Sequence, residues 1–397
     1  MIRIAVIAGP TASGKTRLGI DLALAAGGEV VNADSKQVYR GLDVGTAKPT
    51  AAERAEVPHH LLDLCRPGEG MDAARFCALA DTAIAEVAGR GRLPVVVGGT
   101  GLYLRLLLHG VVPAPGRDPG LRARLEEEAA RLGREAMHRR LAEADPEAAR
   151  RIRSNDLVRV VRALEIAAGG RTQSELFAAH GFRGERYRAR LWALELPRAE
   201  LHRRIDARVE AMFSGGILDE ARRLLERSGG RPPPKLPIGY AEAIACVRGD
   251  LPQGEAVRRV QAAHRRYARR QLTWLRKERG VEWLRPPCDV AALVDHQHLR
   301  HPAEGLEGML QGPQERLGLL PEERLRVALA RVAQHHTQHP GRPPAAPRPD
   351  DQRAPAEVHL GLFPGRRLHP HGRPRAGRLE AAEEAFDRGL APGEPVP

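Results

Sequence analysis

The sequence predicts an α/β protein in which a parallel sheet is flanked by helices and interrupted by an all-helical insertion domain. Short apolar strands alternate with helical stretches between residues 2 and 97, which is the pattern of a parallel sheet with helices on both faces. Residues 117–186 then keep a charged, helical pattern without strand signals. Beyond Pro286 the chain loses its periodicity. At 397 residues, 42% of them hydrophobic, the chain is long enough for two or three domains with a real core.

The first part of the core is predicted at residues 1–116. Residues 2–8 form a short apolar run that ends at Gly9 and Pro10, which indicates a buried strand. A helix follows from Gly14, because its apolar residues recur on one face. The remaining elements expected here are strands at 29–33 and 93–97 and a helix at 72–90.

The second part of the core is predicted at residues 187–288. Residues 187–196 alternate apolar and polar side chains, as in a strand that returns to the sheet after the insertion at 117–186. Helices are expected at 198–228 and 253–279. The last stretch, 289–397, is predicted to be a low-complexity tail. Within it we expect one amphipathic helix at 321–334 and disorder at 340–375, which is rich in proline, arginine and histidine.

The net charge of +13 lies in the predicted folded part of the chain. Residues 289–397 carry 14 basic and 15 acidic side chains, so the excess belongs to the residues before them. A basic folded body favours a polyanionic partner, although an arginine-rich coding bias would give the same count. No apolar run approaches about 20 residues, which argues against a membrane span. The first glycine comes too early for a secretory signal, and four cysteines without ligand spacing favour a reducing, cytoplasmic location.

The most specific local motif is a glycine-rich loop between the first predicted strand and helix. It matches the pattern G-x-x-x-x-G-K-[ST] without a deviation. Backbone N–H groups of such loops bind phosphate oxygens, the lysine adds a positive charge, and the hydroxyl can reach Mg²⁺. The motif therefore predicts a P-loop NTPase-like core, a bound phosphate chain and Mg²⁺ at Thr16. The residues expected to bind phosphate are Gly9, Pro10, Thr11, Ala12, Ser13, Gly14, Lys15 and Thr16.

Two further segments follow predicted strands at the sheet edge where open α/β folds bind ligands. Asp34 comes after the second strand, where a carboxylate can hold Mg²⁺, act as a general base or cap the next helix. Thr100 follows the third strand and two glycines. That segment either admits a ligand to the backbone or forms a capped entry into a helix.

Six motifs occur in one order along residues 3–285. They are Gly9–Thr16, Asp34–Pro49, Gly98–Arg105, Asn155–Glu165, Ile238–Tyr240 and Arg269–Lys277. In this combination and order they resemble the tRNA dimethylallyltransferase family, the tRNA isopentenyltransferases. The sequence from about residue 289 onward resembles nothing in that family.

The resemblance implies a reaction and the roles of four residues. The loop would hold dimethylallyl diphosphate, and the prenyl group would pass to N6 of the adenine at position 37 of tRNAs, giving N6-isopentenyladenosine and diphosphate. Asp34 would act as the general base, and Thr11 would donate to the bridging oxygen of the leaving group. Arg208 would contact the diphosphate, and Lys15 would stabilise its developing charge.

The resemblance also implies that the helical insertion grips the anticodon arm and that the target base leaves its stack. Independently, residues 265–279 contain seven basic residues interleaved with Tyr267 and Trp274, which suits phosphate contacts and stacking but also an ordinary amphipathic helix. The resemblance implies that the residues in contact with tRNA are Asp34, Ser35, Lys36, Gln37, Thr100, Arg122, Val158, Arg159, Val160, Val161, Arg162, Ile238, Gly239, Tyr240, Arg269, Arg270, Gln271, Leu272, Thr273, Trp274, Leu275 and Arg276.

Three other functions stay open at this point. A P-loop small-molecule kinase or NTPase would also need the glycine-rich loop, but it would consume ATP. An adenylate isopentenyltransferase would share the donor and act on a free nucleotide. A non-enzymatic RNA-binding protein would use the loop only structurally. The basic helical insertion and the arginine-rich stretch 265–279 favour an RNA acceptor, and we expect a monomer.

Overall fold

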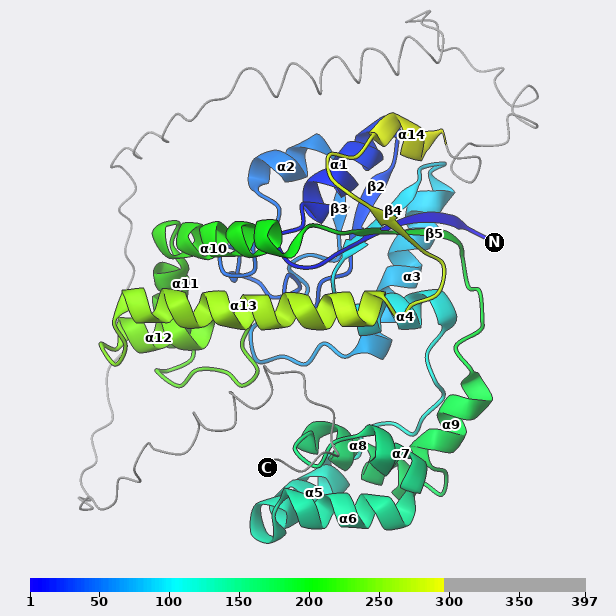
Figure 1. Cartoon of the computed structure of the whole chain (residues 1–397), viewed down its shortest axis with the longest axis vertical. Helices are drawn as coiled ribbons and strands as arrows, with labels where there is room; N and C mark the ends of the chain where they lie inside the picture. The colour runs from blue at the N-terminus through cyan, green and yellow to red at the C-terminus, as the bar shows by residue number, and fades with distance from the viewer. Residues whose placement is uncertain (296–397) are drawn as a thin grey trace, which may run out of the picture. The chain divides into compact units, whose positions relative to one another are not determined.

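The computed structural model describes residues 1–295, and a six-stranded parallel sheet forms its centre (Figure 1). The strand order is β3-β2-β4-β1-β5-β6, so the predicted α/β class is confirmed. Every neighbouring pair of strands is parallel. The strands are β1 (Arg3–Ala8), β2 (Glu29–Asn32), β3 (His59–His60), β4 (Pro94–Gly98), β5 (Arg188–Leu194) and β6 (Val281–Leu284).

The four strands expected from the sequence are all present, and the two edge strands are additional. The strand β3 is two residues long, and the four residues of β6 are all half-buried. Such short edge strands carry neither the apolar run nor the clear alternation that sequence patterns detect.

The four core helices expected from the sequence are present, but one of them is broken, and four further core helices were not expected. The range 198–228 is divided in two at Gly215 and Gly216, and Gly216 has a φ of 112°, which favours glycine. The core helices are α1 (Lys15–Ala25), α2 (Ala51–Glu56), α3 (Ala73–Gly89), α4 (Gly101–His109), α10 (Arg198–Ser214), α11 (Ile217–Arg227), α12 (Tyr240–Val247), α13 (Gln253–Leu275) and α14 (Val290–Val294).

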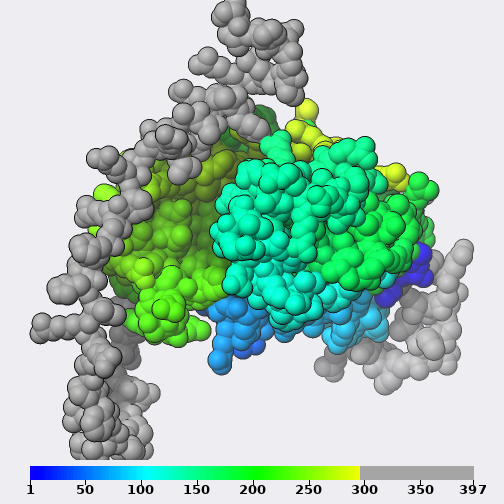
Figure 2. Space-filling model, turned by 90° about the horizontal axis from the view of Figure 1, so that it is seen from below, coloured from blue at the N-terminus to red at the C-terminus, as the bar shows by residue number. Residues whose placement is uncertain are grey.

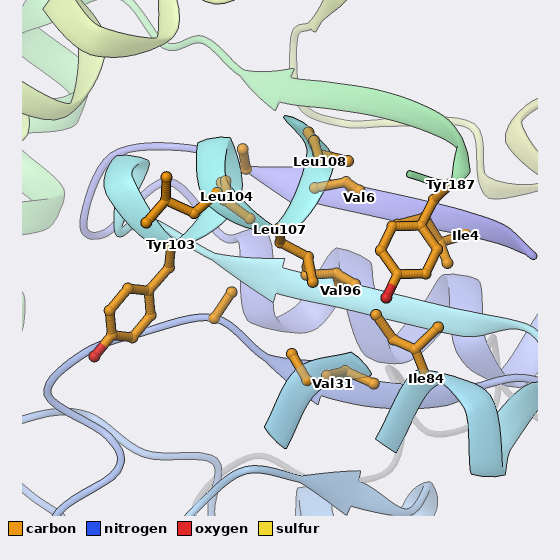
Figure 3. Close-up of a cluster of buried hydrophobic side chains, with 14 of the residues drawn as sticks. Ile4, Val6, Val31, Ile84, Val96, Tyr103, Leu104, Leu107, Leu108 and Tyr187 are labelled. Atoms are coloured by element: carbon orange, nitrogen blue, oxygen red, sulfur yellow. The ribbon is translucent and has the colours of Figure 1, made fainter. Parts of the chain in front are cut away.

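Two apolar layers cover the faces of the sheet. Side chains of one face, including Ile4, Val6 and Val96, pack against α3 and α4, which contribute Ile84 and Leu104 (Figure 3). The alternate residues of the same strands point to the other face and pack against α1. This double burial explains why the strands read as continuous apolar runs.

The helices after β5 form a third apolar cluster. It joins α10, α11, α12 and α13 with Leu42 and Val44 from the segment that follows β2. In Figure 1, α10 and α13 run side by side, and the contacts between the two helices agree. This cluster therefore supports the segment that carries Asp34.

The predicted insertion is all-helical and has its own core. Apolar side chains of α5, α6, α7 and α8, with Leu157 at the start of α8, form a separate buried cluster. In the space-filling view these helices make one continuous surface (Figure 2). The insertion helices are α5 (Pro119–Leu132), α6 (Arg134–Ala144), α7 (Pro146–Arg151), α8 (Leu157–Ala168) and α9 (Gln173–His180).

The helix α14 begins the range that the sequence assigned to a tail. Its Leu293 is 7% exposed and belongs to the cluster on the α1 face of the sheet. The helix expected at 321–334 and the disorder expected at 340–375 lie outside the described residues. Across residues 1–295, no helix combines the length and hydropathy needed to cross a membrane.

Candidate active site

The Gly9–Thr16 loop connects β1 to α1 at the carboxyl edge of the sheet. Ala12 and Gly14 have φ values of 62° and 93°, which bend the loop sharply. A Cβ placed on Gly9 would lie 2.7 Å from the Ser13 Oγ, so the tight turn leaves no room for a side chain there. The Ser13 hydroxyl is buried and makes no hydrogen bond within the described residues. The loop thus has the shape of a phosphate cradle and contains an unused donor.

Gln271 of α13 fixes this loop to the end of β4. Its side-chain oxygen accepts a hydrogen bond from the Thr11 N–H at 2.8 Å, and its amide group donates to the Gly99 carbonyl at 2.9 Å. Gln271 is 6% exposed. The structure places Gln271 between two loops of the sheet edge, and its predicted contact with tRNA stays a prediction.

Three charged side chains meet beside the loop. Burial lowers the pKa of Lys15 to about 8, while Asp34 raises it and Arg208 lowers it further. Burial also lowers the pKa of Arg208, which Asp34 partly offsets. The Arg208 Nε is buried without a partner in the described chain. Lys15 and Arg208 carry two positive charges near the single carboxylate of Asp34, and the Arg208 Nε–H has no acceptor within residues 1–295. An anionic ligand would supply that acceptor and balance the second charge.

Two side chains of α13, His264 and Tyr267, lie next to Arg208 and Asp34. His264 is 8% exposed, its Nε2 is buried without a partner among residues 1–295, and burial together with Arg208 lowers its pKa to about 4. Tyr267 lies one turn further along, and burial followed by the charge of Asp34 raises its pKa. Sequence reasoning missed His264 because a lone histidine on an amphipathic helix gives no signal. It noticed Tyr267 only as a stacking candidate.

A small cavity of about 20 Å³ brings Lys15, Thr16 and Asp34 together with His59. The His59 Nδ1 contacts the Val57 carbonyl at 2.8 Å, which assigns the proton to Nδ1 and leaves Nε2 as a buried acceptor with no partner in the described part of the chain. A cavity of this size holds about one water molecule. Its hydroxyl and carboxylate oxygens are ligands that Mg²⁺ accepts, and no cluster of three or more His, Cys, Asp or Glu ligands exists within residues 1–295. The residues therefore fit a Mg²⁺ ion held largely by phosphate and water rather than by a protein cage.

The turn after β2 is fixed by short polar contacts. Asp34 Oδ1 accepts a hydrogen bond from the Lys36 N–H at 2.8 Å. Thr100 Oγ1 accepts one from the Ser35 N–H at 2.9 Å and donates to Ser35 Oγ at 3.2 Å. Gln37 is 9% exposed and donates to the Ala47 carbonyl at 3.0 Å. Asp34, Ser35 and Thr100 are therefore brought together, because each follows one of the paired strands β2 and β4.

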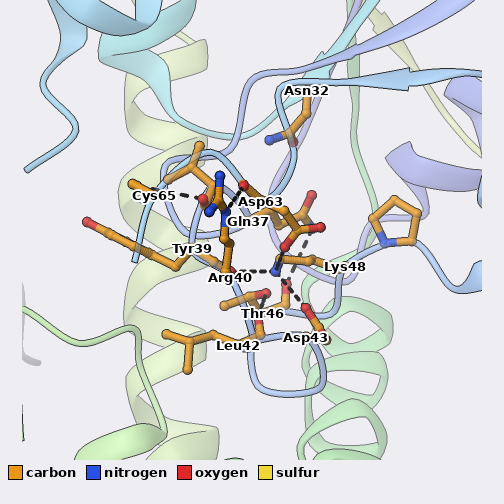
Figure 4. Close-up of polar contacts among 12 residues, drawn as sticks. Asn32, Gln37, Tyr39, Arg40, Leu42, Asp43, Thr46, Lys48, Asp63 and Cys65 are labelled. Carbon is orange, nitrogen blue, oxygen red and sulfur yellow. Dashed lines mark hydrogen bonds and ion pairs between the residues drawn. The ribbon is translucent and has the colours of Figure 1, made fainter. Parts of the chain in front are cut away.

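A buried lysine organises the rest of the Asp34 segment (Figure 4). Lys48 is 7% exposed, and its Nζ donates to the Tyr39 carbonyl, to Asp43 Oδ1 at 2.6 Å and to Asp63 Oδ1. Asp63 also accepts from Arg54 at 2.9 Å. These bonds turn residues 39–48 into a folded loop of fixed shape.

Glu220 of α11 holds the same loop from the other side. Its carboxylate accepts backbone N–H bonds from Asp43 and Val44 at 2.8 Å and from Gly45 at 3.1 Å, and the Tyr240 hydroxyl donates to it at 2.6 Å. Tyr240 has no exposed surface. Gly239 has a φ of 99° and is the N-cap of α12, and Ile238 precedes it. Tyr240 thus packs against Gly45 of this loop, whereas Gly239 lies against Ile217 and Val260, and a role of either residue in tRNA binding stays a prediction.

The predicted contacts in the insertion divide between surface and core. Val158 is 68% exposed and Arg159 is exposed, whereas Val160 and Val161 are buried. Arg122 and Arg162 both pair with the buried carboxylate of Glu165, at 2.6 Å and 3.2 Å. The Arg122 pair joins α5 to α8, and the Arg162 pair lies within α8.

The predicted contacts at the end of α13 divide in the same way. The exposed side chains are Arg269, Arg270, Thr273 and Arg276. Leu275 is buried, and Leu272 and Trp274 are half-buried. The Trp274 ring lies so close to Gly101 that a Cβ there would be 2.2 Å from it. Trp274 therefore packs on the start of α4.

Comparisons with known proteins agree on one family. A family model described as IPP transferase matches residues 37–278. The chain is 74% identical over 294 residues to a tRNA dimethylallyltransferase of Anaeromyxobacter sp. (strain Fw109-5), covering 74% of this chain and 98% of the relative. It is 52% identical to the Myxococcus xanthus tRNA dimethylallyltransferase, over 72% of this chain and 94% of that protein.

Solved structures give the same result. The full-length tRNA isopentenylpyrophosphate transferase of Bacillus halodurans aligns with a TM-score of 0.54 at 35% identity, over 84% of this chain and 100% of that one. A eukaryotic dimethylallyltransferase acting on tRNA aligns with a TM-score of 0.63 at 28% identity, over 75% and 77% of the two chains. The chain therefore belongs to the IPP transferase family, together with the curated tRNA dimethylallyltransferases.

Proposed function

We propose that this protein transfers the dimethylallyl group of dimethylallyl diphosphate to N6 of the adenine at position 37 of tRNAs. The observation that carries the proposal is the meeting of Lys15, Arg208 and Asp34 beside the Gly9–Thr16 loop. The loop and the two cations suit a diphosphate, and the carboxylate suits an amine that must lose a proton. Relatives that are 74% and 52% identical carry the name of this activity.

The donor side of the reaction follows from charge. When the bond between C1 of the prenyl group and the bridging oxygen breaks, negative charge develops on that oxygen. Lys15, Arg208 and the loop N–H groups stabilise this charge, and Thr11 donates to the bridging oxygen. Preorganised donors in a site shielded from water are commonly the largest catalytic contribution. Because the Arg208 Nε and the Ser13 hydroxyl have no other partner within residues 1–295, both are available to the diphosphate.

The acceptor side depends on Asp34. The lone pair of an exocyclic adenine amine is delocalised, so the amine is a weak nucleophile until a proton is shared. The Asp34 carboxylate accepts this proton as the new bond between N6 and C1 forms. General-base assistance is typically worth about 10²–10⁴-fold in rate. Asp34 already accepts the Lys36 N–H on one oxygen, which orients the carboxylate.

Thr16 and Asp34 would hold Mg²⁺ at the small cavity between them. Mg²⁺ supplies positive charge to the diphosphate when it is bound.

The tRNA is proposed to meet the exposed residues of the predicted set. Ser35 and Thr100 lie at the sheet edge beside Asp34, and exposed arginines follow along α13. Val158 and Arg159 are the exposed members in the insertion. RNA loops are read single-stranded, by stacking and by contacts to base edges, which requires the target adenine to leave its stack. The four cysteines, all unpaired, suit the reducing cytoplasm.

One assay tests the proposal against the alternatives. The protein is incubated with labelled dimethylallyl diphosphate, Mg²⁺ and an unmodified tRNA whose anticodon is followed by adenines. We expect label at N6 of adenine 37 in the tRNA. Label in free AMP would indicate an adenylate isopentenyltransferase, and consumption of ATP in a parallel reaction would indicate a kinase or NTPase.

A further inference from the structure

His264 of α13 is a buried polar side chain that none of the reaction steps above uses. It is 8% exposed, and its Nε2 is buried without a hydrogen-bond partner within residues 1–295. Buried nitrogen atoms in folded proteins almost always have a partner, because an unpaired one loses its hydration without compensation. The unpaired Nε2 therefore indicates a partner from outside the chain.

The packing of α13 against α10, which run side by side in Figure 1, shows what His264 faces. Val260, His264 and Ala268 follow one another on the buried face of α13, one turn apart. Val260 belongs to the same apolar cluster as Val209 of α10, and Ala268 packs with Ile205 of α10. His264 therefore faces the part of α10 between residues 205 and 209.

Arg208 lies in this part of α10. Its guanidinium charge acts on the imidazole of His264, which agrees with the placement from packing. Both side chains are buried, and each has a nitrogen without a partner in the described chain, Nε in Arg208 and Nε2 in His264. An anion that binds Arg208 is therefore a candidate partner for His264 as well.

The same part of the interface adjoins the Gly9–Thr16 loop. Ala12, at the tip of the loop, packs with Ala268. His264 is one turn before Ala268, which is about 6 Å along the helix axis. The loop also contains the Ser13 hydroxyl, which is buried and has no partner among residues 1–295. Unpaired polar groups of the loop, of α10 and of α13 thus surround the place where the proposed donor binds.

A neutral imidazole suits a place beside two buried cations. Burial, and then the charge of Arg208, lower the pKa of His264 to about 4, so the ring is uncharged at neutral pH. A neutral ring carries one proton, which either nitrogen can hold. An anion next to Nε2 favours the form with the proton on Nε2, because that N–H donates to the anion. His264 can therefore add a donor without adding to the repulsion between Lys15 and Arg208.

We propose that His264 donates its Nε2–H to a diphosphate oxygen beside Arg208. This inference rests on the proposed function, since the anion is the diphosphate of the donor substrate. The proton stays on the imidazole, and His264 forms and breaks no covalent bond. Because the hydrogen bond is present before and after the prenyl group leaves, its loss should raise KM for the donor and change kcat little.

Titration calorimetry with inorganic diphosphate and Mg²⁺ tests this contact in the full chain. We expect His264→Leu to weaken diphosphate binding about 10- to 100-fold, the usual effect of losing a hydrogen bond to a charged group. His264→Gln should recover part of the affinity, because its amide N–H reaches the place of Nε2, whereas His264→Asn is too short. His202→Leu is the matched control, because it removes a half-buried histidine of α10 that lines a different pocket.

Two further measurements separate binding from folding. Free His264→Leu should unfold at no lower temperature than the wild type, because leucine leaves no unpaired buried nitrogen. In protein labelled with ¹⁵N-histidine, the Nε2 signal that His264→Gln removes should be that of a protonated nitrogen in the diphosphate complex. A purely structural role would not make the protonation of Nε2 depend on diphosphate.

The possible results distinguish this inference from the proposed function. Equal diphosphate affinity of His264→Leu and His202→Leu would overturn the His264 contact and leave the proposed function intact. An unprotonated Nε2 in the complex would do the same, and so would a weaker affinity that follows a lower unfolding temperature of the free variant. A wild-type protein that binds no diphosphate would overturn both proposals.

Discussion

Single side chains carry out the proposed chemistry, and replacing Asp34 has the largest expected effect on kcat. We expect Asp34→Ala to lower kcat by about 10²–10⁴-fold, because the amine proton loses its acceptor. Binding of tRNA, measured at equilibrium without donor, should change little. Asp250→Ala is the matched control, since Asp250 is an exposed carboxylate that makes no side-chain hydrogen bond or ion pair within residues 1–295. An Asp34→Ala enzyme with wild-type kcat would refute the general-base role.

Burial of the charged Lys15 side chain lowers the stability of the folded protein. A pKa near 8 instead of 10.5 means that burial disfavours the charged form by on the order of 3 kcal/mol. We therefore expect Lys15→Met to raise the melting temperature while it abolishes binding of dimethylallyl diphosphate. Differential scanning calorimetry and donor titration measure the two effects. A variant that loses both stability and binding would show that Lys15 stabilises the free protein.

The same lysine predicts a pH dependence. Because the folded pKa is lowered, the folded chain binds fewer protons than the unfolded chain between about pH 8 and 10.5, so the contribution of Lys15 to the free energy of unfolding rises with pH in that window. Binding of dimethylallyl diphosphate needs the charged Lys15 ammonium, so the affinity for this donor should fall as the pH rises. We expect kcat/KM for dimethylallyl diphosphate to fall as the pH rises above about 8. A flat profile from pH 7 to 9.5 would contradict this assignment.

At the scale of elements, α13 connects two loops of the site through one side chain. Gln271→Leu leaves the Thr11 N–H and the Gly99 carbonyl without their partners, and each buried unpaired group costs about 1–3 kcal/mol. We expect lower stability in urea and a higher KM for the donor, because the loop loses its fixed shape. Thr273→Val, an exposed substitution two residues further along the helix, should keep the stability within about 0.5 kcal/mol. Equal stability of the two variants would show that the Gln271 contacts are dispensable.

The elements also show what sequence can and cannot predict. The Gly9–Thr16 loop was predictable because the chemistry of phosphate binding requires consecutive residues. The positions of Asp34 and Thr100 after predicted strands were also visible in the sequence, but their contact depends on the pairing of β2 with β4. The bond from Gln271 to Thr11 spans 260 positions, and the pairing of Glu220 with residues 43–45 spans about 175, so no local pattern contains either. The edge strands β3 and β6 are too short to show the alternation of apolar and polar side chains from which a strand is predicted.

At the scale of the whole molecule, the boundary of the folded core is testable. Because Leu293 of α14 is buried against the sheet, a chain ending at Pro287 should be less stable than one ending at Asp295 by about 1.5–3 kcal/mol, the value of one buried leucine. The chain ending at Asp295 should keep the kcat and KM of the full chain, since every residue of the proposed site precedes it. Thermal unfolding and the prenyl transfer assay compare the three chains. Loss of activity on ending at Asp295 would assign a catalytic contribution to the last hundred residues.

The carboxylate of Glu220 makes the shape of the loop at residues 43–45 depend on α11, which lies outside the proposed active site. This one carboxylate accepts hydrogen bonds from the N–H groups of Asp43, Val44 and Gly45 and from the Tyr240 hydroxyl. A substitution in α11 that moves Glu220 can therefore displace Asp34 although the substituted residue contacts no substrate. Inherited or laboratory variants that weaken turnover should therefore concentrate in two places, around the reacting atoms and along this concealed scaffold. A search for inactivating changes restricted to the catalytic neighbourhood would overlook the second group.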